Sequence, residues 1–396
     1  MTKERSLLLV LAGINFTTIM DFMIMMPLGP QFKRIFDIGP SMWSALISSY
    51  TFAAAVSGFL AIFLLDAFDR RKALLFLYAG FIAATVLVGL APTVYMLLAA
   101  RALTGVFGGI IGALVLAIVG DVVPGPRRGK AMGIIMMGFS AAASLGVPLG
   151  LLLGTTFGWR FAFFMIAGFA AVLYVLAWKL VPQVRTHLGR PGSRIQKSIR
   201  GIKAVVTDSN QLKALLFMVL IVFGQFSIIP FISPYMVANV GFREMELTYI
   251  YLVGGSLTVF SSPWIGKIAD RRGKHHTFGV LMLLSLIPIY AITHMGAIPI
   301  ALVLVFSTMF FVFASGRMVP ASAIVVGTAH PDYRGTFMSI RSVSVSLGQG
   351  VAAYCAGLIM VENIDGTYSN FNVVGYIGIA TSLVSYLILR RISDKY

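Results

Sequence analysis

The sequence LDAFDRRK at residues 65–72 returns as ADRRGK at residues 269–274. Each copy joins an aspartate to a cluster of basic residues, and each follows a long apolar segment. A second pair repeats at nearly the same offset, because RGKAMG at 128–133 corresponds to RGTFMS at 334–339. The two halves of the chain are therefore predicted to be copies of one unit with the same topology. Membrane transporters are often built this way, with the binding site at the interface of the repeats.

Apolar segments recur along the whole chain and predict transmembrane helices. The chain is 58% hydrophobic and 11% charged, whereas a soluble domain has about 25% charged residues. About 20 residues at 1.5 Å per residue cross the hydrocarbon layer, and only helices satisfy their own backbone groups there. We predict twelve spans, at residues 7–30, 42–65, 73–92, 94–120, 131–154, 161–181, 212–236, 247–267, 276–296, 298–322, 336–360 and 371–390.

The positively charged residues are concentrated on one side of the predicted membrane spans. The net charge is +17, yet the odd-numbered connections contain only Lys33, Arg34, Arg160 and Arg243. Almost all other Lys and Arg residues lie in even-numbered connections or at the termini. By the positive-inside rule, both termini are cytoplasmic in a multi-pass inner (plasma) membrane protein. The excess charge suits anionic membrane lipid, and no nucleic-acid partner is expected.

The longest polar segment, residues 182–211, divides the chain. We predict an N-terminal six-helix bundle at 1–181, a basic cytoplasmic linker at 182–211 and a C-terminal six-helix bundle at 212–396. The linker has two interpretations, an amphipathic helix on the membrane surface or a solvated connection. The helical interpretation rests on the spacing of Ile195, Ile199, Ile202 and Val206.

Several classes of function have no support in the sequence. The single Cys355 cannot form an intrachain disulfide, and no Cys/His spacing indicates a metal site. There is no phosphate-binding loop for ATP, no set of nucleophile and base that indicates an enzyme, and no cofactor is expected. The apolar run after Lys3 and Arg5 lacks a cleavage site of small residues, so it is interpreted as a retained first helix.

Asp21 is the acid most clearly placed inside a predicted span. A carboxylate at that depth is costly, so by default it marks a functional site. The repeat offset places Gln225 of the second half at the equivalent depth, and Pro234 opposite Pro30. The alternative is that Asp21 is a buried acid neutralised by a partner that holds helices together.

The repeated loops resemble a family motif, Gly-x-Leu-Ala-Asp-Arg-x-Gly-Arg-Lys. Residues 62–72 keep its acid and its basic cluster but lack both glycines, and residues 266–274 match better. Over essentially all 396 residues the chain resembles a major facilitator superfamily transporter of the twelve-helix drug:proton antiporter type, close to bacterial sugar and nucleoside efflux permeases. The resemblance implies an all-α membrane protein with twelve transmembrane helices in two pseudo-symmetric six-helix bundles.

The resemblance also implies roles for charged residues near the cytoplasmic loops. In the family these loops form charge networks that close the cytoplasmic side, and pairs of modest strength suit a latch that opens in each cycle. Asp121 would face Arg70, and Arg341 is a candidate partner of Asp66. The alternative is that the charges only set topology. The predicted gate comprises Asp66, Arg70, Arg71, Asp121, Asp270, Arg271 and Arg341.

Arg101 and the fifth span carry two further resemblances. Arg101, in RALTG at 101–105, matches a motif whose arginine is tied to proton coupling in relatives, so Asp21 and Arg101 are the predicted coupling pair. Whether they touch does not follow from the sequence. LGVPLG at 145–150 resembles the antiporter signature of exporters. Gly146, Pro148 and Gly150 are the predicted hinge, with close packing by small residues as the alternative.

Polar residues at mid-span depth are candidates for a central cavity. Arg317 is expected either to bind an anionic group of the substrate or to satisfy backbone carbonyls. The others could instead bridge helices, each stabilising the fold by about 0.6 kcal/mol. The candidates are Asn15, Asp21, Tyr50, Gln225, Tyr251, Arg317 and Gln349.

These features together predict a secondary active transporter. It would export a small molecule by alternating access in exchange for protons, and we expect a monomer. A proton-independent facilitator or a lipid flippase is one alternative. A membrane sensor with a transporter-like body but no transport activity is another.

Overall fold

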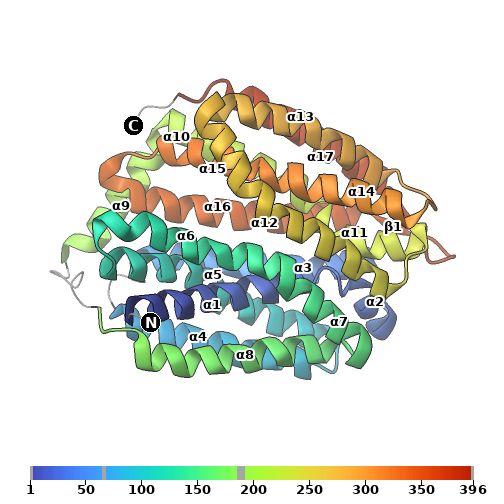
Figure 1. The fold of residues 1–396 in the computed structure, drawn as a ribbon, viewed down its shortest axis with the longest axis horizontal. Coiled ribbons are helices and arrows are strands. Elements are labelled where there is room, and N and C mark those ends of the chain that lie inside the picture. The colour runs from blue at the N-terminus through green and yellow to red at the C-terminus, as the bar shows by residue number, and fades with distance from the viewer. Residues whose placement is uncertain (1–2, 65–67, 185–191, 394–396) are drawn as a thin grey trace. The chain divides into compact units, whose positions relative to one another are not determined.

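A computed structural model describes residues 3–64, 68–184 and 192–393 and shows long helices along the chain (Figure 1). Eleven of these helices are long and apolar enough to cross a membrane. The remaining predicted span, 247–267, coincides with α12 (Leu247–Arg272), a helix of 26 residues. Its glycines and hydroxyl-bearing residues lower its mean hydropathy, so length and continuity identify it better than apolarity does. The all-α prediction is confirmed, apart from one short hairpin.

The chain forms two compact units. Unit 1 contains Met1–Met25 and Ser49–Arg200, and unit 2 contains Met26–Ser48 and Gly201–Tyr396. Helix α3 (Pro40–Leu64) contributes its first residues to unit 2 and the rest to unit 1. The other helices of unit 1 are α1 (Lys3–Ile24), α4 (Arg70–Leu90), α5 (Val94–Val122), α6 (Gly125–Ala141), the π-helical turn η2 (Ala142–Gly146), α7 (Val147–Phe157) and α8 (Trp159–Leu180).

Unit 2 contains the second set of spans. Its first helix in the sequence is α2 (Gly29–Phe36), and a two-stranded antiparallel hairpin joins its last two spans. The hairpin pairs β1 (Val361–Glu362) with β2 (Tyr368–Ser369). The other elements are α10 (Ser209–Phe226), α11 (Ile229–Tyr235), η3 (Met236–Val240), η4 (Glu244–Glu246), α12, α13 (Lys274–Thr293), α14 (Ile300–Phe310), η5 (Phe311–Ser315), α15 (Met318–Gly327), η6 (Pro331–Tyr333), α16 (Arg334–Ile359) and α17 (Phe371–Leu389).

The first span is shorter than predicted. We expected one segment from residue 7 to residue 30, but α1 ends at Ile24, a turn follows, and α2 begins at Gly29. Pro27 lies in the turn and disfavours a helical residue before it. Pro30 lies at the start of α2, where its missing N–H costs no helical hydrogen bond. Apolarity alone did not reveal this break.

Polar contacts fasten α2 and the start of α3 within unit 2. Lys33 Nζ lies 2.9 Å from a carboxylate oxygen of Glu362 in β1. Trp43 Nε1 donates a hydrogen bond of 2.9 Å to the carbonyl oxygen of Pro230. Arg34 also forms an ion pair with Glu244. Residues 26–48 therefore pack with elements that lie far along the chain, which neither repeats nor hydropathy indicated.

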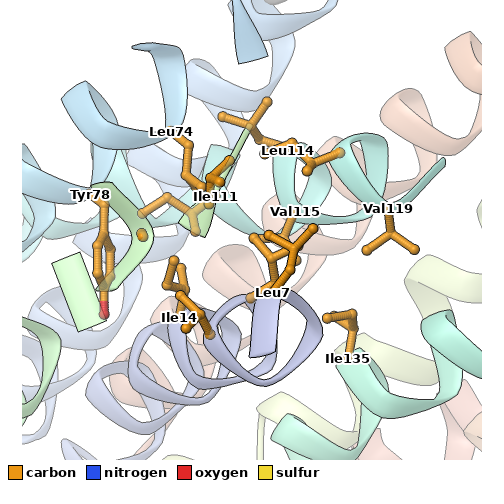
Figure 2. Packing of buried hydrophobic residues seen from close by; sticks show 14 of the residues in the cluster. Leu7, Ile14, Leu74, Tyr78, Ile111, Leu114, Val115, Val119 and Ile135 are labelled. Atoms are coloured by element: carbon orange, nitrogen blue, oxygen red, sulfur yellow. The ribbon is translucent and has the colours of Figure 1, made fainter. Parts of the chain in front are cut away.

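The core of unit 1 fills the space between α1, α4, α5 and α6 (Figure 2). Leu7 and Ile14 lie seven residues apart on α1, which places them on one face of the helix. Their side chains pack in the same cluster as Ile111 and Val115 of α5. This apolar packing holds α1 against α5, the two helices that carry the charged pair described below.

The predicted linker contains a helix, α9 (Gly192–Thr207). Val205 is buried in the core of unit 2, whereas Ile199 and Val206 are each 53% exposed. The division between the units, after Arg200, falls inside this helix. Of the two interpretations of the linker, the helical one agrees with the described part of this segment.

Candidate functional site: a buried charged pair in unit 1

An ion pair between α1 and α5 forms the centre of the candidate site. Asp21 lies in the last turn of α1, and Arg101 lies near the start of α5. Arg101 Nη1 donates to Asp21 Oδ2 at 2.7 Å, and both side chains have an exposed fraction of 0%. The structure therefore answers the question that the sequence left open, because the two residues are in direct contact.

Two further polar contacts orient the pair. Thr85 Oγ1 of α4 donates to Asp21 Oδ1 at 3.3 Å. Arg101 Nη1 also donates to the backbone carbonyl of Asp21, at 3.4 Å. A negative side chain in the last turn of a helix adds to the negative end of the helix dipole. The positive charge of Arg101 thus compensates the negative charge of the Asp21 carboxylate and the partial negative charge at the C-terminal end of α1.

Tyr50 of α3 completes the surroundings of the guanidinium. The guanidinium carbon of Arg101 lies 4.8 Å from the centre of the Tyr50 ring, within the range of a cation–π contact. The same ring stacks on Phe22, with 5.0 Å between ring centres. Tyr50 was predicted as a cavity residue, and the structure places it beside the buried pair of Asp21 and Arg101.

Two glycines of α5 allow Tyr50 this position. A Cβ atom on Gly105 would overlap the backbone carbonyl of Tyr50 and lie 2.9 Å from its Cα. A Cβ atom on Gly108 would lie 2.7 Å from the Tyr50 hydroxyl oxygen. The sequence interpretation used Gly105 only as part of the Arg101 motif. Gly105 follows Arg101 by four residues, so the sequence places the two residues on one face of α5. The sequence did not indicate that α3 packs against this face.

The arrangement can respond to a proton. Among the described residues, no hydrogen-bond partner contacts Nε or Nη2 of Arg101. Protonation of Asp21 would remove the charge that holds Nη1, and arginine itself stays charged. The guanidinium would then need other acceptors, such as water or the oxygens of a substrate. A buried pair of this kind can convert proton binding into a change of contacts.

The other predicted cavity residues have partners within their own units. Asn15 Nδ2 donates to the carbonyl of Ile135 at 3.2 Å, which links α1 to α6. In unit 2, Gln225 Nε2 donates to Ser315 Oγ at 3.3 Å. The hydroxyl oxygens of Tyr251 and Ser233 lie 2.8 Å apart. These contacts fit the alternative of helix bridging, and their role in a cavity stays a prediction.

Arg317 and Gln349 complete the predicted cavity set. Arg317 is fully buried and donates to Ser285 and Ser382 of unit 2. Gln349 lies half-buried on α16, and within the described part of the chain no hydrogen bond of its side chain is seen. The role of these two residues in a cavity stays a prediction.

The predicted cytoplasmic gate is only partly assembled within the units. Arg70 Nε lies 3.3 Å from Asp121 Oδ2, as the resemblance implied. Arg71 donates to the carbonyl of Trp178. Asp66, the predicted partner of Arg341, lies outside the described residues.

The remaining gate residues have contacts of other kinds. Arg341 Nη2 donates to Ser322 Oγ at 2.9 Å. Asp270 and Arg271 are exposed at the end of α12, and no ion pair joins them to another described residue. Their role as a gate therefore stays a prediction.

The fifth span packs closely on α1 and changes its helical form before Pro148. Residues Ala142–Gly146 form a π-helical turn, and α7 continues from Val147. A Cβ atom on Gly146 would lie 3.0 Å from the Met20 sulfur, and one on Gly150 would lie 2.7 Å from Ile24 Cδ1. Proline cannot donate the regular helical hydrogen bond, and both prolines and π-helical turns are common sites of helix kinks. Close packing is therefore observed, and the hinge role stays a prediction.

We expect Asp121→Asn to destabilise unit 1 modestly. Arg70 is largely buried, with a side-chain exposed fraction of 10%, and would lose one charged acceptor. The expected cost is about 1–2 kcal/mol in the free energy of unfolding, measured by denaturation of the purified protein in detergent. Asp332→Asn makes the same chemical change at a side chain that is 77% exposed. Equal stability of the two variants would contradict a structural role for the Arg70–Asp121 pair.

Comparison with known proteins agrees with this architecture. A family model described as Major Facilitator Superfamily matches residues 11–353, with a further match at residues 215–395. The chain belongs to the Major Facilitator Superfamily. As a member of this superfamily it is a multi-pass membrane transporter of small molecules and not an enzyme.

Curated relatives within the superfamily cover nearly the whole chain. The inner membrane transport protein YdhP of Escherichia coli (strain K12) is 29% identical over 366 residues, which are 90% of each chain. The probable sugar efflux transporter of Helicobacter pylori (strain G27) is 25% identical over 374 residues, covering 92% of this chain and 89% of the relative.

Solved structures share the superfamily fold at lower identity. A bacterial homolog of the human lysosomal transporter Spinster superposes with a TM-score of 0.77 at 15% identity, over 99% of this chain and 98% of that chain. The nucleoside transporter NupG superposes with a TM-score of 0.73 at 11% identity, over 98% of each chain. At these identities the likeness establishes the fold of this superfamily member.

Proposed function

We propose that this superfamily member is an exporter of the bacterial inner membrane that exchanges a small molecule for protons by alternating access. The observation that carries the proposal is the fully buried pair of Asp21 and Arg101. Asp21 lies inside a predicted membrane span. Burying a carboxylate there costs free energy, so such an acid by default marks a functional site. Within the described spans, the other acids lie at or near helix ends.

Proton exchange follows from the chemistry of the pair. A proton on Asp21 neutralises the only carboxylate that contacts Arg101 among the described residues. Each change of protonation therefore alters the contacts of α1 with α5, and α1 also packs on the fifth span. In this proposal Asp21 carries the proton, Arg101 senses it, and Gly146, Pro148 and Gly150 allow the fifth span to bend.

Export and the type of substrate are inferred from the relatives and from the charge distribution. One relative is named as a probable sugar efflux transporter, so we infer a small polar molecule such as a sugar. Another is named as an inner membrane transport protein, and the charge distribution favours cytoplasmic termini. We further propose that the protein acts as a monomer and that the charged residues of the cytoplasmic loops act as its gate.

Proton movement in proteoliposomes tests the proposal. Purified protein is reconstituted, and internal pH is recorded while sugars, nucleosides and cationic drugs are added in turn. We expect a substrate-dependent proton signal in the wild type and none in Asp21→Asn. The double variant Asp21→Asn/Arg101→Gln is run in parallel because it leaves no charge unpaired, so a lost signal cannot be due to one buried charge. Asp332→Asn, at an exposed acid, should retain the signal.

Other outcomes would indicate other functions. Substrate flux without proton movement, unchanged by Asp21→Asn, would indicate a facilitator, or a flippase if the cargo is lipid. Ligand binding without any flux would indicate a sensor. Either result would overturn proton coupling at Asp21.

A further inference from the structure

Unit 2 contains a second fully buried arginine. Arg317 lies between η5 and α15, and its exposed fraction is 0%. It reaches two neighbouring helices, because Nη1 donates to Ser285 Oγ of α13 at 3.1 Å and to Ser382 Oγ of α17 at 2.9 Å. The guanidinium is thus inside the helix packing of unit 2 and is held in position from one side.

The two serines cannot neutralise the guanidinium. Ser285 Oγ donates its hydrogen to the carbonyl of Met282 at 2.7 Å, and Ser382 Oγ donates to the carbonyl of Gly378 at 2.7 Å. Each hydroxyl therefore offers Arg317 only a lone pair. Both groups are uncharged, so the full positive charge of Arg317 stays uncompensated by them.

The opposite edge of the guanidinium is buried and has no hydrogen-bond partner among the described residues. In the described part of the chain, Arg317 Nε and Nη2 have no hydrogen-bond partner. These two N–H groups point in parallel and form the edge that binds carboxylates and similar anions in a bidentate manner. Leaving buried donors unsatisfied is costly, and leaving a buried charge unpaired is more costly still.

Among the described residues of unit 2, no carboxylate takes this position. The described acidic residues of unit 2 lie at helix ends or in connections, and no ion pair to Arg317 is formed by any of them. Unit 1 provides the contrast, because its buried Arg101 has a carboxylate at 2.7 Å. The described residues therefore supply a carboxylate to Arg101 and none to Arg317.

We propose that Arg317, held by Ser285 and Ser382, is a binding site for a small anion. The anion binds to the Nε–Nη2 edge and supplies the negative charge that Asp21 supplies in unit 1. A free halide and the carboxylate of a small organic acid have the required chemistry. This site is independent of the proposed proton exchange, since binding needs neither a gradient nor Asp21.

Thermal unfolding of the purified full chain in detergent tests the proposal. The starting buffer contains a bulky sulfonate as its only buffer anion, and sodium chloride, sodium bromide and sodium acetate are titrated separately at constant ionic strength. We expect a saturable rise of the unfolding midpoint by about 2–4 °C in the wild type, because a ligand that binds only the folded state stabilises it. Arg317→Gln should abolish the rise, and Arg317→Lys should weaken the apparent affinity by about 10-fold or more, because lysine lacks the planar fork.

Two controls separate anion binding at Arg317 from general effects of charge and of folding. Arg272→Gln makes the same chemical change at an exposed arginine and should retain the full response. Arg317→Gln removes an uncompensated buried charge, so it should unfold no lower than the wild type in the sulfonate buffer. If that variant does not fold, Arg317→Lys carries the same comparison.

The three anions distinguish the source of the ligand. A response to halides identifies a free inorganic anion, and a response to acetate alone identifies a carboxylate group. Either supports the proposal when it depends on Arg317. A wild-type midpoint that responds to none of the three anions, or an equal response in Arg317→Gln, would overturn it. Proton signals in proteoliposomes are measured separately, so this failure and a failure of proton exchange are distinguishable.

Discussion

Asp21→Asn is expected to destabilise the protein by about 3–5 kcal/mol, more than the removal of its partner. Both groups of the Asp21–Arg101 pair are fully buried, so losing one leaves the other uncompensated. The two losses are unequal because a carboxyl group can become neutral by binding a proton, whereas an arginine cannot lose its charge. Arg101→Gln should therefore cost less than Asp21→Asn.

The double variant Asp21→Asn/Arg101→Gln should recover part of the loss. Residues in direct contact show interaction energies of about 0.5–3 kcal/mol in double-mutant cycles. The free energy of unfolding is measured by denaturant titration in detergent for all four proteins. Asp332→Asn serves as the matched control and should change stability by less than about 0.5 kcal/mol. Strictly additive costs of the two single variants would show that the pair contributes no coupling.

Gly105→Ala should destabilise unit 1 by about 3 kcal/mol or more, although alanine is the better helix former. The new methyl group would overlap the backbone carbonyl of Tyr50, and backbone cannot move aside as a side chain can. The change would also displace the Tyr50 ring from Arg101, 4.8 Å away. We therefore expect a weaker proton signal in proteoliposomes, if the proposed exchange holds, together with the lost stability, measured by denaturant titration in detergent.

Gly120→Ala is the control on the same helix. A Cβ atom there would meet no other atom within 4 Å. Because alanine favours a helix over glycine by about 1 kcal/mol, this variant should be neutral or slightly stabilising. The two substitutions are chemically identical and lie in one helix, so opposite signs would isolate the effect of helix contact. Equal stabilities would contradict the close approach of α3 to α5.

The overall architecture was predictable because it follows from the length of the apolar segments, from the internal repeat and from the composition. A bilayer requires about 20 apolar residues for each helix, and every predicted span corresponds to helix in the structure. The break after Ile24 was missed, because hydropathy does not report the turn that Pro27 imposes. The packing of residues 26–48 with unit 2 was missed for a different reason, since repeat and hydropathy carry no information on contacts between distant segments.

The sequence by itself determined which charges enter the membrane, and the tertiary structure decided what they touch. Asp21, Arg101 and Arg317 were recognisable because few charged residues interrupt the apolar spans. The partners of the two arginines differ, since Arg101 forms an ion pair with a carboxylate whereas Arg317 donates hydrogen bonds to two serines. Those partners lie on other helices, and the way the helices pack sets the pairing. Burying a charge without a partner costs free energy, so each buried charge requires one. Which residue becomes that partner is decided by how the helices pack.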